Sequence, residues 1–387
     1  MTTYSGCVSA AEWSVEPYVN ASVLYDDNIL FSTTQPKDTL GLYVPVGISL
    51  NRNTEINRAS VKASLFIREY DDPDVIDSVD QHLDIDVGHY GERNQLGLQA
   101  GYHADTTTFS EIDTSGPVQL DRDVARKTLT PFWNFLFTER SSLQLSYSWQ
   151  DADYDALPSE FTDYTYQIAQ LGYRYQFSPR ADVSLDYGYS ELFIPDRGIS
   201  GLPGVESTTK TNIYTLGSTY HFSETFSANV QIGYRDTSEQ TLYVPLPGQP
   251  EETVEGTGRL YDVSFTDKGE TLSWTISANR DLVPNGSDGS LNETDTIKMN
   301  FNWRTGITTN LLFNTGYIET QTSVSSLQPG RKYYWMEPAV WYGLARGTGL
   351  RFSYRYSRQE YDNNPDQAES NRFMITLNHA FTKQSWN

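Results

Sequence analysis

The feature that most constrains this chain is an alternation of apolar and polar residues that continues from near residue 15 almost to the C-terminus. Residues 60–65 read Ser, Val, Lys, Ala, Ser, Leu, and residues 350–355 read Leu, Arg, Phe, Ser, Tyr, Arg. Successive side chains of a strand point to opposite faces, so each such segment predicts a strand between an apolar and a polar environment. We count about 18 segments of roughly ten residues, the length that a tilted strand needs to cross a bilayer.

The connections between these segments alternate between short and long. Short polar turns are predicted at residues 52–55, 91–94, 139–141, 178–180, 267–270 and 346–349. Longer connections, rich in Pro, Gly, Asp and Glu, are predicted at residues 26–38, 105–124, 191–208, 236–258 and 358–370. This asymmetry is typical of bacterial outer-membrane barrels. The sequence therefore predicts an all-β chain: a single transmembrane antiparallel β-barrel of about 18 strands, with short periplasmic turns and long extracellular loops.

Composition excludes several other classes. There are 28 Lys and Arg against 50 Asp and Glu, a formal net charge of -22, which opposes binding to a nucleic-acid backbone. No apolar run approaches the roughly 20 residues of a membrane helix. The 27 Tyr, 17 Phe and 8 Trp suit a barrel, whose strands and interfacial girdles favour aromatic residues.

The N-terminus resembles the end of a signal peptide. Val8, Ser9 and Ala10 read as a small-x-small cleavage site, although no basic or apolar region precedes them. We therefore expect residues 1–10 to be the remnant of a signal peptide, residues 11–381 to form the barrel, and residues 382–387 to be a C-terminal extension. In the alternative, Cys7 belongs to a lipoprotein signal and is acylated; cleavage after Ala10 would instead leave no cysteine.

The last segment and three prolines bear on the strand boundaries. Residues 373–381 alternate up to the aromatic Phe381, which resembles the C-terminal signal of outer-membrane barrels, except that six residues follow it.

Pro45, Pro131 and Pro338 lie inside predicted strands, where each lacks a ladder donor and predicts a bulge or a misplaced boundary.

If the apolar set faces lipid, the other set lines a lumen that carries both signs of charge. Opposed charged walls orient polar solutes in a pore, whereas charges that pair with one another only keep the interior wet. The predicted pore-lining residues are Lys62, Asp84, Asp86, Arg174, Asp182, Asp186, Arg235, Asp262, Lys298, Arg304, Arg351 and Arg355.

Enzyme and cofactor motifs are nearly absent. None of the five His falls in a metal-ligand spacing, and phosphate loops and dinucleotide fingerprints are missing, so we expect no catalytic residue, no metal and no cofactor. His82 or His103 could act as a base in a barrel hydrolase, but Ser is too abundant for a nucleophile to be singled out.

Neutral polar side chains of the predicted lumen suit sugar hydroxyls, although amides and hydroxyls are also ordinary lumen fillers. They include Gln99, Gln144, Gln170, Asn229 and Gln231, and Tyr18 and Tyr43 could stack on sugar rings. Acidic connections could hold divalent ions that bridge lipopolysaccharide phosphates, or could simply be solvated.

The segment Pro17-Tyr-Val-Asn-Ala-Ser-Val-Leu-Tyr-Asp-Asp-Asn-Ile-Leu resembles the opening of the putative β-barrel porin (type 2) family. Residues 25–29, Tyr-Asp-Asp-Asn-Ile, are its distinct motif, and the rest of the chain is similar in strand rhythm and length. The resemblance implies an outer-membrane barrel associated with exopolysaccharide export, with polysaccharide and periplasmic export components as partners.

Together these patterns predict a Gram-negative outer-membrane porin-like channel, in contact with lipid and lipopolysaccharide, for export or passage of polysaccharide or other polar solutes. Two alternatives stay open. One is a structural or adhesive barrel whose long loops close the lumen, and the other is the barrel hydrolase.

Overall fold

The computed structural model describes residues 12–72, 75–111, 122–156, 161–195, 205–243, 252–287, 289–322, 330–362 and 364–386. Residues 1–10, with the predicted signal-peptide remnant and Cys7, lie outside this range.

Nineteen strands account for most of the described chain. They are β1 (Glu12–Asp26), β2 (Thr39–Asn53), β3 (Asn57–Tyr70), β4 (Ser78–Tyr90), β5 (Asn94–Thr106), β6 (Asp123–Thr138), β7 (Ser141–Tyr154), β8 (Tyr164–Ser178), β9 (Ala181–Ile194), β10 (Val205–His221), β11 (Phe226–Tyr243), β12 (Glu252–Lys268), β13 (Leu272–Asn285), β14 (Ser290–Arg304), β15 (Thr309–Thr322), β16 (Arg331–Ala345), β17 (Thr348–Tyr361), β18 (Asn364–Ala380) and β19 (Gln384–Trp386). One short helix, α1 (Thr107–Ser110), follows β5. In the described residues, no helix is long and apolar enough to span a membrane.

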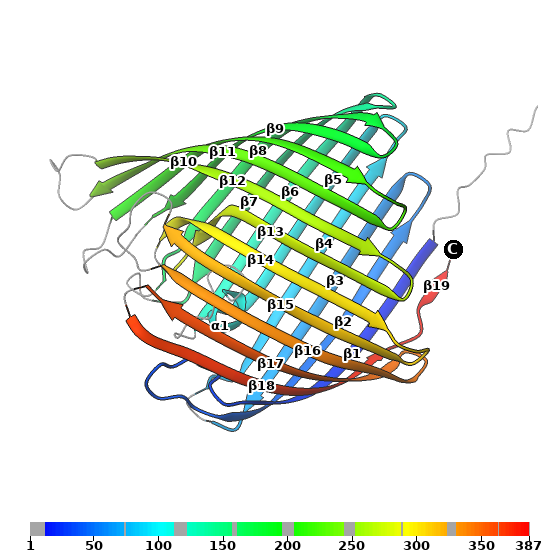
Figure 1. Cartoon of the computed structure of the whole chain (residues 1–387), viewed down its shortest axis with the longest axis vertical. Helices are drawn as coiled ribbons and strands as arrows, with labels where there is room; N and C mark the ends of the chain where they lie inside the picture. The colour runs from blue at the N-terminus through cyan, green and yellow to red at the C-terminus, as the bar shows by residue number, and fades with distance from the viewer. Residues whose placement is uncertain are drawn as a thin grey trace, which may run out of the picture.

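The first 18 strands form a closed antiparallel barrel (Figure 1). Each strand pairs with the next along the chain, and β18 returns to pair with β1 from Asp26↔Arg372 to Tyr18↔Ala380. Closure satisfies the hydrogen-bonding groups of both edge strands, which a bilayer cannot do. The prediction of a single barrel of about 18 strands is confirmed.

Short turns gather at one end of the barrel, and both chain ends of the wall lie there too (Figure 1). The turn between β16 and β17 is Arg346-Gly347, in which Gly347 has φ 76°, a conformation that favours glycine. β19, in the predicted C-terminal extension, pairs with the start of β1 through Trp13↔Trp386. The opposite end of the barrel is therefore the one that carries the longer connections.

The outer face of the barrel is apolar. Side chains such as Leu42, Leu65, Leu185 and Ile232 are exposed there, alternating with residues that point inward. A closed barrel with an exposed apolar band is the form in which strands cross a bilayer.

Aromatic residues mark both limits of this band. Phe177 and Phe222 are exposed beside the short turns. Farther along the strands, outward tyrosines donate to polar side chains: Tyr187 Oη lies 2.8 Å from Asn212 Oδ1, and Tyr317 Oη lies 2.6 Å from Glu319 Oε2. Paired aromatic girdles are typical of barrels in the outer membrane.

The three strand prolines cause neither a bulge nor a boundary. Pro45, Pro131 and Pro338 lie inside β2, β6 and β16. On one side of each, the pairing skips the proline and resumes in the same register, as from Leu129↔Trp149 to Phe132↔Ser146. The predicted bulges are wrong because a strand tolerates one missing backbone hydrogen bond when the pairing before and after it is intact.

Some connections are much shorter than predicted. β17 continues to Tyr361 and β18 begins at Asn364, so most of the loop predicted at residues 358–370 is strand. Likewise, β11 reaches Tyr243 and β12 starts at Glu252 within the predicted loop 236–258. These strand ends lie beyond the tyrosines, where both faces are polar and apolar alternation no longer identifies a strand.

Candidate functional site in the barrel lumen

All twelve predicted pore-lining residues lie on the inner face of the wall. Each alternates along its strand with residues that point outward. Lys62, for example, lies between Val61 and Ala63 on β3 and is the register partner of Asp84 on β4. The residues are Lys62 on β3, Asp84 and Asp86 on β4, Arg174 on β8, Asp182 and Asp186 on β9, Arg235 on β11, Asp262 on β12, Lys298 and Arg304 on β14, and Arg351 and Arg355 on β17. Their part in a pore stays a prediction.

A polar cavity of about 590 Å³ lies on the inner face of β7 to β13. Three of the twelve residues line it together with several amides: Arg174, Asp186, Asp262, Gln144, Gln170, Asn229, Gln231 and Asn279. The structure therefore brings part of the predicted set into one space.

Hydrogen bonds inside this cavity hold the acids and amides in place. Asn229 Nδ2 donates to Asp262 Oδ1 at 3.1 Å, and Ser184 Oγ donates to Asp186 Oδ2 at 2.9 Å. Arg174 Nε lies 3.7 Å from Asp182 Oδ1 and is largely exposed. The walls thus present amide and carboxylate groups at fixed positions to whatever enters.

Above the cavity, toward the longer connections, β12 and β13 separate. Their pairing ends at Tyr261↔Arg280, although β12 continues beside β11 and β13 continues beside β14. We call residues 281–287 and 289–291, the end of the β13–β14 hairpin, the tucked hairpin. Its Gly286 carbonyl accepts a hydrogen bond of 2.8 Å from Thr162 N, in the connection between β7 and β8. The hairpin end thus reaches across the inner side of the wall.

The tucked hairpin is anchored by an apolar cluster. Leu282 and Leu291 belong to a buried group with Leu260 of β12 and Leu192 of β9. Gly286 is required for the approach, because a Cβ at this position would lie 2.4 Å from the Tyr154 ring. An apolar core therefore fills part of the lumen at this end, where a wide porin would have water.

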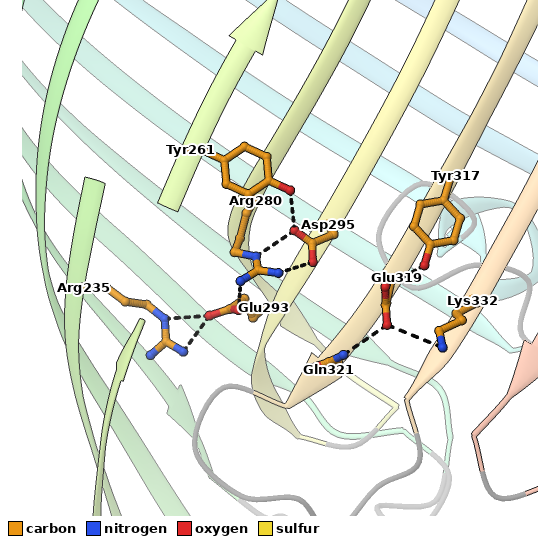
Figure 2. Close-up of polar contacts among 9 residues, drawn as sticks. All are labelled: Arg235, Tyr261, Arg280, Glu293, Asp295, Tyr317, Glu319, Gln321 and Lys332. Atoms are coloured by element: carbon orange, nitrogen blue, oxygen red, sulfur yellow. Dashed lines mark hydrogen bonds and ion pairs between the residues drawn. The ribbon is translucent and has the colours of Figure 1, made fainter. Parts of the chain in front are cut away.

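An ionic chain ties the tucked hairpin to the wall where β12 and β13 separate (Figure 2). We call its five residues, Arg235, Glu293, Arg280, Asp295 and Tyr261, the seam network. Arg235 Nη2 lies 2.8 Å from Glu293 Oε2, and Arg280 Nη1 lies 3.1 Å from Glu293 Oε1. Arg280 Nε then donates to Asp295 Oδ1 at 2.7 Å, and Tyr261 Oη donates to the same atom at 2.9 Å.

The seam network shows why Arg235 does not face open water. Its side chain is 3% exposed and is in contact with Glu293 of β14 and Thr237 of its own strand. A buried charge is stable only when it is paired, so Glu293 is its structural counterion.

A second inward segment follows β5. Glu111, just after α1, is buried and forms an ion pair with Arg126 of β6. Tyr154 Oη donates to Glu111 Oε1 at 2.9 Å. This segment and the tucked hairpin both contact Tyr154, so they narrow the same end of the lumen.

The inner face of β14 to β17 is cationic and aromatic. Lys298 Nζ and the Arg355 guanidinium lie 5.9 and 5.8 Å from the centre of the Trp335 ring. Glu337 pairs with Arg351 at 2.6 Å and with Arg355 at 3.6 Å. Sequence reasoning found these cations but missed the lumenal Trp335, which alternation with outward Tyr334 and Met336 could have placed.

The inner face of β3 to β5 is rich in acids and histidines. Lys62, Asp84 and Asp86 border a cavity of about 360 Å³ there. Next to it, the His82 and His103 rings stack with centroids 4.3 Å apart, and His82, His103 and Asp105 offer ligand atoms within 4.8 Å of one another.

His82 and His103 thus meet across β4 and β5 although they lie far apart in sequence. The predicted turn at residues 91–94 is symmetric about a point between residues 92 and 93, which places 82 opposite 103 in an antiparallel hairpin. The position of this turn in the sequence was therefore enough to predict that His82 and His103 lie opposite each other.

The motif at residues 25–29 lies where the barrel closes. Asp26 is fully buried, and it accepts hydrogen bonds from Arg372 Nε at 2.7 Å and Ser370 Oγ at 2.8 Å. Asn28 Nδ2 donates to the Glu369 carbonyl at 2.9 Å. In this chain the motif joins the end of β1 to β18, so its role in the fold is to stabilise closure of the barrel.

No family model matches the chain, and no curated protein matches it. Among solved structures it is similar to the siderophore receptor PiuA from Acinetobacter baumannii, with a TM-score of 0.49 and 10% identity over 94% of this chain and 82% of that one. It is also similar to OpdL from Pseudomonas aeruginosa, with a TM-score of 0.47 and 11% identity over 97% and 99% of the two chains. OccAB4 from Acinetobacter baumannii gives a TM-score of 0.48 and 10% identity over 97% and 98%.

The closed wall, the apolar outer band with its aromatic girdles and the polar inner face are features of the chain itself. Only a membrane-spanning barrel combines them, and in bacteria such single-chain barrels belong to the outer membrane. The chain is a closed 18-stranded outer-membrane β-barrel.

Proposed function

We propose that this barrel is an outer-membrane channel for polar, hydroxyl-rich solutes, with saccharide chains as the preferred cargo. The observation that carries the proposal is the cavity of about 590 Å³, whose inner wall presents amides beside paired carboxylates. Amides both donate and accept, and carboxylates accept, so together they match hydroxyl groups, which do both.

Lumenal aromatic residues add to this support. Trp335 and Tyr18 lie on the inner face, and flat rings can contact the apolar faces of sugar rings. The resemblance of the opening segment to an exopolysaccharide-associated family points to the same cargo. The motif itself contributes to barrel closure here, so the groups that would bind the cargo are those of the lumen.

The test is single-channel conductance of the refolded barrel in a planar bilayer, with neutral or acidic oligosaccharides added to one side. We expect ohmic currents that a saccharide blocks. Gln170→Leu, in the cavity, is expected to weaken the block by about tenfold, since a polar site loses binding when one of its partners is removed. The matched control is Gln167→Leu on the same strand, whose side chain lies on the outer face and accepts from Tyr147.

Block that is unchanged in Gln170→Leu, or absent from the wild-type barrel with open channels, would contradict the saccharide assignment. If the channel conducts ions but no saccharide blocks it, the barrel is a general pore and the saccharide assignment is wrong.

A second candidate is a barrel that is closed at rest. The apolar cluster and the seam network favour it, because both hold the tucked hairpin inside the lumen. It predicts a folded barrel that is silent in the bilayer and becomes conductive when the seam network is broken.

A further inference from the structure

The inner face of β4 and β5 carries a group of residues that the channel proposal does not use. His82 on β4 and His103 on β5 are direct register partners, and Asp105 lies two residues beyond His103. All three point into the lumen, because their strand neighbours Leu83 and Tyr102 are exposed on the outer face.

These side chains are already in contact. His82 Nε2 lies 2.6 Å from Asp105 Oδ1, and His103 Nε2 lies 2.9 Å from Asp84 Oδ1. The two imidazole rings are inclined by 22°. The side chains of His82 and Asp105 are 24% and 13% exposed, so the lumen can still reach them.

The surrounding charge favours a cation. Asp80, Asp84 and Asp105 lie on this face, and Arg68 is bound to Asp80. His82 and His103 thus sit between the carboxylates of Asp105 on one side and Asp84 on the other, with imidazole nitrogens available as ligands.

The donor set selects the kind of ion. Zinc is bound at about 2.0–2.2 Å by imidazole and carboxylate, which places neighbouring ligand atoms about 3.3–3.5 Å apart. The ligand atoms of His82, His103 and Asp105 span at most 4.8 Å, so rotations of the side chains bring them to that separation without moving the strands. Two imidazoles exclude calcium and magnesium, which prefer oxygen.

We propose that His82, His103 and Asp105 form a lumenal site for a divalent transition-metal ion of the zinc type, with Asp84 oriented to support His103. The carboxylate on the other imidazole nitrogen is the usual arrangement around a metal-bound histidine. This site is distinct from the saccharide cavity, and its occupancy does not depend on what the channel carries.

The test is binding of Zn²⁺ to the tag-free, refolded full chain in detergent, measured by calorimetry in the presence of excess Ca²⁺ and Mg²⁺. One saturable Zn²⁺ per barrel is expected. His82→Ala and His103→Ala should each weaken it by at least about tenfold, since even the loss of an outer partner costs that much. His89→Ala is the matched control, because His89 lies on the outer face of the same strand and contacts Asn57.

Electron paramagnetic resonance of the Cu²⁺-loaded wild-type barrel gives a readout that needs no variant. Hyperfine coupling to two imidazole nitrogens is expected. Coupling to none, displacement of Zn²⁺ by Ca²⁺, or full binding by the His82→Ala/His103→Ala double variant would overturn the proposal. Asp105→Asn replaces the alanine variants if these lose the heat-modifiable mobility of a folded barrel.

Discussion

Asp26 shows how much of the barrel's closure one side chain carries. It is completely buried and has contacts with Arg372, Ser370 and the backbone of Asn28. Because β1 and β18 are the first and last strands of the wall, the contacts with Arg372 and Ser370 require both ends of the barrel wall to be in place.

Replacing Asp26 by Asn should lower the free energy of unfolding by about 3–5 kcal/mol, because Arg372 loses its buried counterion. Urea unfolding in detergent, followed by tryptophan fluorescence, measures the change. Glu55→Gln, in an exposed short turn, is the control and should change stability by no more than about 0.5 kcal/mol. Equal stability of the two variants would show that the closure does not depend on this pair.

Asp71 connects the end of β3 to the start of β2. Its carboxylate accepts from Leu40 N at 2.8 Å and from Thr39 Oγ1 at 2.8 Å. The hydrogen bond from the Leu40 backbone and that from Thr39 hold the pKa of Asp71 below its ordinary value of 3.8.

Since the carboxylate is the accepting form, the stabilisation is present above the ordinary pKa of Asp71 and is lost as the pH falls through its lowered value. The Leu40 amide resonance should therefore titrate with a midpoint below 3.8, and this titration should disappear in Asp71→Asn. A midpoint at or above 3.8 would contradict the contact.

At the scale of elements, the end of the β13–β14 hairpin lies on the inner side of the wall and packs in an apolar cluster there. It leaves the wall where Tyr261 and Arg280 pair, and its outward residues face the inner side of β11 and β12. The same strand face is therefore exposed to lipid near the short turns and buried in the apolar cluster near the longer connections. Leu282 and Leu291 are core residues although their face continues that of the lipid-exposed Ile276 and Ile297.

Glu293→Gln removes the carboxylate that pairs with buried Arg235 and with Arg280. Losing one partner of a buried pair costs about 3–5 kcal/mol, so hydrogen exchange of residues 281–287 should accelerate by about 100-fold or more, and conductance should rise. Exchange mass spectrometry measures the first effect and planar-bilayer recording the second.

Glu319→Gln is the matched control on the adjacent strand. Glu319 accepts from Tyr317 and pairs with Lys332 on the outer face, and Figure 2 shows it beside the seam network. Exposed pairs of this kind contribute at most about 1 kcal/mol. Equal acceleration in both variants would mean that the hairpin is not held by the seam network.

At the scale of the whole molecule, the acidic balance sets the expected ion preference. The formal net charge is -22, and acids outnumber bases on the inner face of β4 and β5. A negative potential concentrates cations in a narrow, low-dielectric passage. The open channel should therefore be cation-selective, with a reversal potential of the corresponding sign in a KCl gradient. Anion selectivity would show that the arginines of β14 to β17 control the passage.

The strand arrangement was largely predictable, and its errors have a clear cause. Alternation identified the wall and placed the twelve predicted lumenal charges on its inner face, because a bilayer enforces strict two-sidedness where strands cross it. It failed for residues 358–361 and 364–370, which are strand, because water on the outer side no longer requires apolar residues there.

The candidate site was predictable only in part. Arg174, Asp186 and Asp262 could be assigned to the lumen, but not to one cavity, since the barrel's curvature brings β8, β9 and β12 together. Opposition of His82 and His103 could have been derived from their hairpin, whereas the Arg235–Glu293 contact joins strands that are not neighbours in the wall.

The sequence by itself determined a membrane barrel and the face on which the residues of its apolar–polar segments lie, because both follow from period-two alternation and local turns. Only the tertiary structure decided that β12 and β13 separate, that the tucked hairpin enters the lumen and that Asp26 meets Arg372. These features depend on contacts between segments distant in the chain, and their geometry is set by closure of the wall, which local pattern does not encode.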